Sequence, residues 1–196
     1  MDTHNETPIF YRFDSKKYST TFAAYPVIFI KALQEKDFRN DGPRDIHKFL
    51  RNGEYPKWIQ FPICFQQIDG KILRDIIESR SVSFDLISLR LRDLLKDNHI
   101  SGWESYTIQL YDKRGNQIEG YCGFSVIGRG GNIIFKRDGW NLKKEDRIYN
   151  VSQWDGSDIF LLGGSIYITE SVMKLLQKNK ISGAEFVPMS ERFTII

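Results

Sequence analysis

The amino-acid sequence predicts an α+β protein, with a mostly antiparallel sheet and a few flanking helices. Short aromatic and β-branched runs alternate with turn signals such as residues 112–116 and the pair Gly163 and Gly164, as expected for hairpins. Few stretches have apolar residues at helical spacing, and these stretches lie beside predicted strands instead of alternating regularly with them. Hydrophobic residues at 41% and charged residues at 27% are typical of a globular chain.

The amino-terminal third is predicted to begin with a hairpin. Residues 9–30 are rich in aromatic and β-branched side chains, and the polar run 14–17 divides them into two strands. The apolar stretch 22–33 predicts a buried strand, because it is about half the ~20 residues of a membrane-spanning helix and contains Pro26 and Lys31. Residues 34–57 are polar and predict a surface connection, with a short helix near 45–50.

The next segment is predicted to contain one strand and one helix. Residues 58–68 are apolar and aromatic, and Asp69 and Gly70 then end the run. Residues 71–80 follow with apolar side chains at helical spacing, which predicts an amphipathic helix. These side chains are Ile72, Leu73, Ile76 and Ile77.

The chain resembles itself at an offset of 81 residues. Residues 94–102 and 175–183 share Leu, Leu, Asn, Ile, Ser and Gly at matching positions. Apolar strands at 85–87 and 166–168 precede the two predicted helices, and each strand is followed by a hydroxyl residue suited to an N-cap. We therefore expect two copies of a strand-helix-turn-strand unit. The residues that define it are the N-caps Ser88 and Thr169, the left-handed helix ends Asn98 and Asn179, and the turn glycines Gly102 and Gly183.

This organisation predicts two regions that pack as one compact unit. Residues 1–80 supply amino-terminal strands and a connecting helix, and residues 81–196 contain the duplicated units. Two copies are too few for a solenoid, which needs at least three. We therefore expect both copies within one compact domain.

Composition argues against several classes of function. The net charge is +3, but basic residues alternate with acidic ones, so we expect no nucleic-acid binding. Residues 1–8 have no apolar signal core, and no apolar run is long enough to cross a membrane. The two cysteines, Cys64 and Cys122, are far apart and predict reduced thiols. We expect a cytoplasmic protein that does not bind membranes.

No assembled catalytic or metal-binding motif is found in the sequence. His4, His47 and His99 have no partner at metal-ligand spacing, and the glycines of 128–131 do not form a phosphate loop. Asp155 and Asp158 form the one acidic cluster of interest. Such a pair can bind a cation or share a proton, although an Asx-type turn is the favoured interpretation. We predict no catalytic residue, cofactor or metal.

Two regions carry a family resemblance. The first, near the carboxyl end, consists of residues 154–160, 166–170, 175–176, 181–183 and 186–188, and the second is the run 86–106, which is similar to a motif in the first half of that family's proteins. Together they resemble the immunity proteins that are encoded beside bacterial polymorphic toxins, over roughly residues 83–190. The amino-terminal third matches only in its aromatic strand texture. The resemblance implies no catalytic residues.

The resemblance implies that the chain binds a cognate toxin and covers its active site. Large aromatic side chains are the usual anchors of such interfaces, although most of them belong to the core of any domain. The positive charge makes a basic nuclease a less favourable target. Two alternatives stay open: an enzyme with a dispersed carboxylate site, and a self-associating structural protein that forms homo-oligomers. The candidate partner-binding residues are Trp103, Trp140, Trp154, Asp155 and Asp158.

Overall fold

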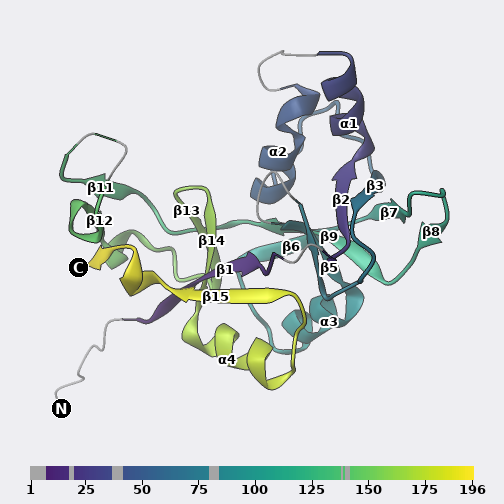
Figure 1. Ribbon diagram of the computed structural model, residues 1–196. Helices are drawn as coiled ribbons and strands as arrows, with labels where there is room; N and C mark the ends of the chain where they lie inside the picture. The colour runs from purple at the N-terminus through teal and green to yellow at the C-terminus, as the bar shows by residue number, and fades with distance from the viewer. Residues whose placement is uncertain (1–7, 18–19, 37–41, 80–83, 138, 140–141) are drawn as a thin grey trace.

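The protein is an α+β structure, and its described residues form three mixed but mostly antiparallel sheets and four α-helices. A computed structural model describes residues 8–17, 20–36, 42–79, 84–137, 139 and 142–196 (Figure 1). The helices are α1 (Val27–Gln34), α2 (Ile46–Asn52), α3 (Leu89–Asp97) and α4 (Glu170–Lys178), and short 3-10 turns are η1 (Pro43–Asp45), η2 (Lys144–Asp146), η3 (Val151–Gln153) and η4 (Met189–Glu191).

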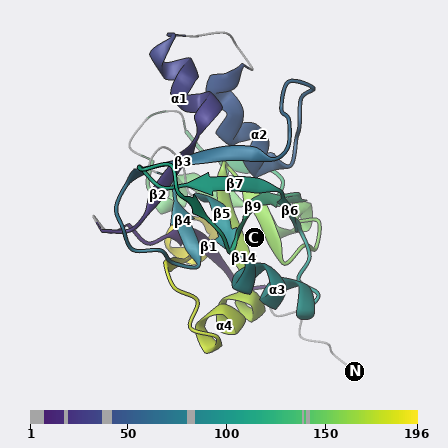
Figure 2. The same ribbon diagram turned by 90° about the vertical axis from the view of Figure 1, so that its right-hand side faces the viewer.

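The largest sheet has eight strands. In spatial order they are β6 (Trp103–Tyr106), β9 (Tyr121–Val126), β5 (Phe84–Ser88), β4 (Ile76–Glu78), β2 (Ala23–Pro26), β3 (Ile63–Asp69), β7 (Ile108–Tyr111) and β8 (Gln117–Ile118). The pairs β2–β4 and β3–β7 are parallel, and the other neighbours are antiparallel. Helices α1 and α2 lie above this sheet and α3 below it in both views (Figures 1 and 2).

Two smaller sheets complete the molecule. The five-stranded sheet has the order β10 (Gly128–Arg129), β13 (Ile159–Leu162), β14 (Ser165–Thr169), β1 (Phe10–Ser15) and β15 (Ala184–Pro188). The small sheet consists of β11 (Ile133–Phe135), β12 (Arg147–Tyr149) and β16 (Thr194–Ile195). Strand β1 therefore lies between two strands from the far end of the chain, so the pairings cross the predicted boundary at residue 80.

The two segments that match at an offset of 81 have the same order of elements. Strand β5, helix α3 and strand β6 correspond to β14, α4 and β15. We call β4–β5–α3–β6 with the preceding Asp75 the first unit, and β13–β14–α4–β15 with the preceding Asp158 the second unit. Each unit begins with an antiparallel hairpin, and its last strand is separated from that hairpin by one strand from elsewhere, β9 or β1.

Local capping explains why the two helices begin and end where they do. The Ser88 hydroxyl accepts a hydrogen bond from the Leu91 amide at 3.1 Å, whereas Thr169 occupies the N-cap without such a bond. The left-handed residues are His99 and Lys180, with φ of 53° and 52°. The prediction of Asn98 and Asn179 was thus wrong by one position. Their side-chain amides instead donate to carbonyls four residues back, which keeps their backbone at negative φ.

Three sequence predictions in the amino-terminal third were wrong. Strands β1 and β2 do not form a hairpin, because each pairs within a different sheet. The stretch 22–33 is not one strand: the chain leaves β2 at Pro26 and continues as helix α1. The short helix predicted near 45–50 is present as α2, but residues 34–57 are not only a surface connection, because four side chains of α2 are buried. Its apolar and aromatic side chains cover one face of the eight-stranded sheet.

The helix predicted at 71–80 is not found in its described residues 71–79, of which Ile76–Glu78 form strand β4. Ile76 and Ile77 are both fully buried in β4, where they point into different apolar clusters on opposite faces of the sheet. Ile72 and Leu73 are instead 47% and 43% exposed. A strand that is buried on both faces has consecutive apolar residues, and this pattern cannot be distinguished from one turn of a helix by spacing alone.

The core joins the two units. One cluster of buried side chains lies between the eight- and five-stranded sheets and includes residues of α3 and α4. Leu91 and Leu95 of α3 meet Val172 and Leu176 of α4 in this cluster, and Phe13 of β1 lies among them. A second cluster lies beneath α1 and α2, and a third lies between the five-stranded sheet and the small sheet.

Candidate functional site

Asp158 binds the turn of the other unit. Its carboxylate accepts hydrogen bonds from the Ser101 amide at 3.0 Å and the Ser101 hydroxyl at 2.8 Å. The Asp158 amide in turn donates to the Ser101 hydroxyl at 3.0 Å. Ser101 lies in the turn after α3, whereas Asp158 immediately precedes β13. Asp158, one of the candidate residues predicted from the sequence, therefore connects the first unit to the second.

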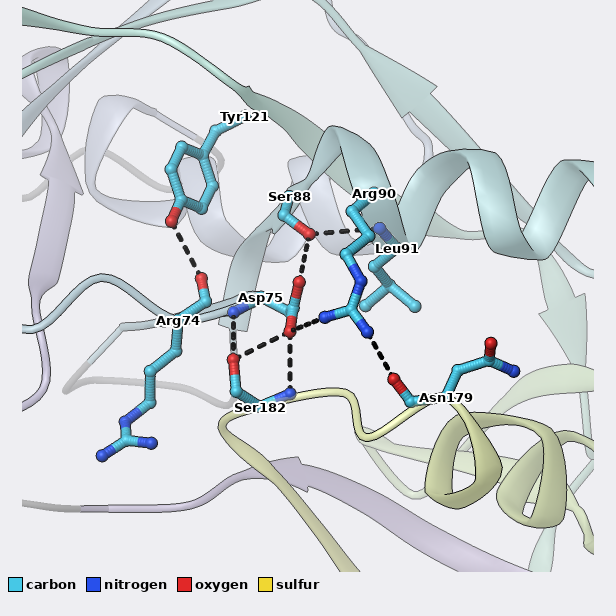
Figure 3. Close-up of polar contacts among 8 residues, drawn as sticks. All are labelled: Arg74, Asp75, Ser88, Arg90, Leu91, Tyr121, Asn179 and Ser182. Atoms are coloured by element: carbon cyan, nitrogen blue, oxygen red, sulfur yellow. Dashed lines mark hydrogen bonds and ion pairs between the residues drawn. The ribbon is translucent and has the colours of Figure 1, made fainter.

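Asp75 makes the corresponding contact in the opposite direction. It immediately precedes β4, and its carboxylate accepts from the amide and the hydroxyl of Ser182, each at 2.8 Å (Figure 3). The Asp75 amide donates to the Ser182 hydroxyl at 2.9 Å. Ser182 lies 81 positions after Ser101 and follows helix α4. Each unit thus supplies one aspartate and one serine to the other, and the three hydrogen bonds are the same in both pairs.

Asp75 has additional partners and is more deeply enclosed than Asp158. Its carboxylate also accepts from the Ser88 hydroxyl at 2.7 Å and from Arg90 at 3.1 Å (Figure 3). Arg90 reaches from the start of α3 and also donates to the carbonyl of Asn179. Burial alone raises the pKa of Asp75, but the hydrogen bonds from Ser182 and Ser88 and the charge of Arg90 bring that pKa below its ordinary value.

Sequence reasoning missed the Asp75 site. Asp75 fell within the predicted helix at 71–80, so its position before a hairpin was not expected. The Ser at matching positions of the two units was visible at the offset of 81, but a single sequence gives no partner for it. An aspartate directly before each hairpin is the signal that could have identified both pairs.

Asp155 forms a turn and also receives an amide from a neighbouring strand. Its carboxylate accepts from the Ser157 amide at 2.9 Å, which is the Asx-type turn that the sequence favoured, and from the Arg129 amide at 2.7 Å. Partial burial raises the pKa of Asp155, but hydrogen bonds from Ser157 and Arg129 bring it below the ordinary value. Asp155 and Asp158 therefore bond to different parts of the chain.

The two predicted tryptophans that the structure describes are half-buried. Trp103 stacks on Phe124 with 5.9 Å between ring centroids, and its indole donates to the Ile100 carbonyl. It also lines a cleft of about 360 Å³ beside the edge strand β6. Trp154 packs edge-to-face against Phe10 in the third core cluster. Trp140, the remaining candidate, lies outside the described residues.

A buried histidine–aspartate pair lies under helix α2. His47 Nδ1 contacts the carboxylate of Asp85, and their side chains are 5% and 1% exposed. The rings of Tyr25 and Phe29 pack edge-to-face against the imidazole. His47 thus pairs with Asp85, whereas Asp155 and Asp158 accept hydrogen bonds from other parts of the chain.

A cleft lies between the loop that follows β3 and the β7–β8 turn. It has a volume of about 840 Å³ and is lined by Lys71, Lys113 and Arg114 together with Asp69 and Asp112. The Asp112 carboxylate accepts three hydrogen bonds from its own turn, two from Asn116 and one from the Arg114 amide. These hydrogen bonds lower the pKa of Asp112.

The small sheet has an apolar outer face. Tyr149 is fully buried in the third core cluster, so its cross-strand partners Ile133 and Ile195 define the inner face. Side chains alternate along a strand, which places the neighbouring residues on the other side of the sheet. We call these the outer face, and they are Ile134, Ile148, Thr194 and Ile196. Ile134 and Ile196 are 46% and 62% exposed.

Across the residues that the structure describes, no group of three or more His, Cys, Asp or Glu side chains is placed to hold a metal ion. The helices among them are also too short or too polar to cross a membrane. Comparison with models of known protein families found no match, and a search of curated proteins likewise found none.

Proposed function

We propose that this chain is an immunity protein that binds a cognate bacterial toxin and covers its active site. The sequence resemblance over roughly residues 83–190 motivates the proposal. The observation that supports it most is the apolar outer face of the small sheet, where Ile134 and Ile196 are about half exposed. Exposed apolar side chains that adjoin one another are characteristic of surfaces that bind proteins.

The polar candidate residues favour binding over catalysis. The carboxylates of Asp155 and Asp158 accept hydrogen bonds from backbone amides and serine hydroxyls of the same chain. An inhibitor that acts by occlusion needs no reacting group, and a stable complex buries about 1,200–2,000 Å² in total. The proposal includes a cytoplasmic location, where the free thiols of Cys64 and Cys122 stay reduced.

Co-expression with the neighbouring toxin tests this function. The toxic carboxy-terminal domain encoded by the adjacent gene is expressed in a bacterial host with and without this chain. We expect the chain to restore growth and to co-elute with the toxin domain in size-exclusion chromatography. Restored growth without a physical complex would instead identify an enzyme that inactivates the toxin or its product. Failure to restore growth would refute the proposed function.

A further inference from the structure

The outer face of the small sheet combines two features that together describe a binding partner. The first is its apolar row, in which Ile134 and Ile148 are cross-strand neighbours and Thr194 follows on the next strand. Ile196 continues this side beyond β16, since its amide donates to the Tyr149 carbonyl at 3.0 Å. A partner can therefore bury several apolar side chains here without displacing any part of the described chain.

The second feature is the positive charge at the end of the β11–β12 hairpin. The described residues of this region, 136–137, 139 and 142–147, contain five Lys or Arg and two Asp or Glu. Arg137 and Asp146 form an ion pair, in which the Asp146 carboxylate accepts from Arg137 at 2.7 Å and also from the Lys143 amide at 2.9 Å, so these two charges offset each other. Lys136, Lys143 and Lys144 are exposed. The apolar face therefore adjoins a group of cationic side chains.

From these two features, and on the basis of the proposed function, we infer that the toxin docks on the outer face of the small sheet through an apolar patch bordered by acidic side chains. Acidic groups on the partner would face Lys143 and Lys144 while its apolar side chains cover Ile134 and Ile196. Charge complementarity of this kind speeds association and selects the partner.

The same charge argues against a second copy of this chain as the occupant. A symmetric dimer through the outer face would bring two hairpin ends with the same sign of charge to one interface. Like charges that face each other across an interface repel, and proteins use this repulsion to exclude wrong partners. A partner with the opposite charge removes that cost.

Two variants separate the apolar and the charged contributions. Ile134→Asp places a charge in the apolar row, and the double variant Lys143→Glu with Lys144→Glu reverses the cationic group without altering that row. Ile72→Asp is the matched apolar control, because Ile72 is 47% exposed and lies in the loop between β3 and β4 of the eight-stranded sheet, outside the small sheet. Lys113→Glu with Arg114→Glu is the matched charge control, because these adjacent residues are exposed in the β7–β8 turn.

The experiment measures the Kd of each purified variant for the toxin domain encoded by the adjacent gene, with circular dichroism to confirm folding. We expect Ile134→Asp and the Lys143/Lys144 double variant each to raise Kd about 10-fold or more, as for central interface residues. We expect the two controls to stay within about 3-fold of the original chain, and the effect of the double variant to shrink at high salt.

The possible outcomes are distinguishable. If the original chain binds the toxin and the outer-face variants bind equally well, this inference is wrong and the proposed function stands. Tighter binding by the Lys143/Lys144 double variant would refute the inference that the docking patch of the toxin is bordered by acidic side chains. If the chain alone forms a dimer that Ile134→Asp dissociates, a second copy of the chain occupies the outer face instead. If the chain sediments with anionic lipid vesicles, a membrane occupies that face instead. No binding by any form would refute the proposed function itself.

Discussion

Replacing Asp75 with alanine is expected to destabilise the protein far more than replacing Asp158. Both aspartates make the same three hydrogen bonds with a serine of the other unit. Asp75 is only 8% exposed and also accepts from the Ser88 hydroxyl. Its removal leaves buried donors without an acceptor, at about 1–3 kcal/mol each, so we expect a loss of about 3–5 kcal/mol. For the more exposed Asp158, water replaces the lost partner and the loss is about 1–2 kcal/mol.

Urea unfolding followed by tryptophan fluorescence measures both variants against the original chain. At this chain length 1 kcal/mol corresponds to a change in Tm of about 2–4 °C, so the two variants are also separated in a thermal scan. Arg90→Ala is a useful control, since the Arg90 side chain is 58% exposed and its ion pair with Asp75 contributes little. Equal losses for Asp75→Ala and Asp158→Ala would refute the argument that burial sets the strength of these pairs.

Three further predictions follow from the described contacts. The folded-state pKa of Asp75 is below its unfolded value, so the contribution of this carboxylate to stability is complete above about pH 4 and is lost as the pH falls through the folded pKa. Asp75→Asn should therefore make the stability depend less on pH in acid unfolding followed by circular dichroism, and an unchanged curve would contradict this. Burial raises the pKa of Cys122 to about 11, so iodoacetamide at pH 8 should label the half-buried Cys64 first, as read by mass spectrometry; equal labelling rates would argue against burial of Cys122. A Cβ at Gly123 would lie 2.0 Å from the Tyr106 ring, so Gly123→Ala should lower the free energy of unfolding in urea by about 1–3 kcal/mol. Adding Tyr106→Leu to that variant should recover part of the loss, whereas additive effects of the two substitutions would exclude this steric cause.

The sequence was most informative where structure is decided locally. The hydroxyl residues at Ser88 and Thr169 mark the starts of α3 and α4, and Gly102 and Gly183 have positive φ where the turn requires it. A cap or a turn depends on a few adjacent residues, so its signal survives in one sequence. The two glycines of the β13–β14 hairpin, Gly163 and Gly164, were predictable for the same reason, and both have positive φ.

Prediction failed where distant pairing decides the outcome. The apolar run 22–33 contains both a strand and a helix, because only residues 23–26 have neighbouring strands with which to pair. The candidate site was affected in the same way. Asp158 was identified as an isolated acid, but its partner Ser101 lies 57 positions earlier, and Asp75 and Ser182 are 107 positions apart. Spacing within a motif contains no information about contacts of that range.

The position of β1 has a consequence for synthesis on the ribosome. Phe10–Ser15 is translated before the strands on either side of it, β14 and β15, which are completed only at Thr169 and Pro188. Strand β1 therefore has no sheet neighbour while residues 16–169 are synthesised, at about 5–20 residues per second. Until then β1 lacks its neighbouring strands, and the five-stranded sheet can be completed only after Pro188 has been synthesised.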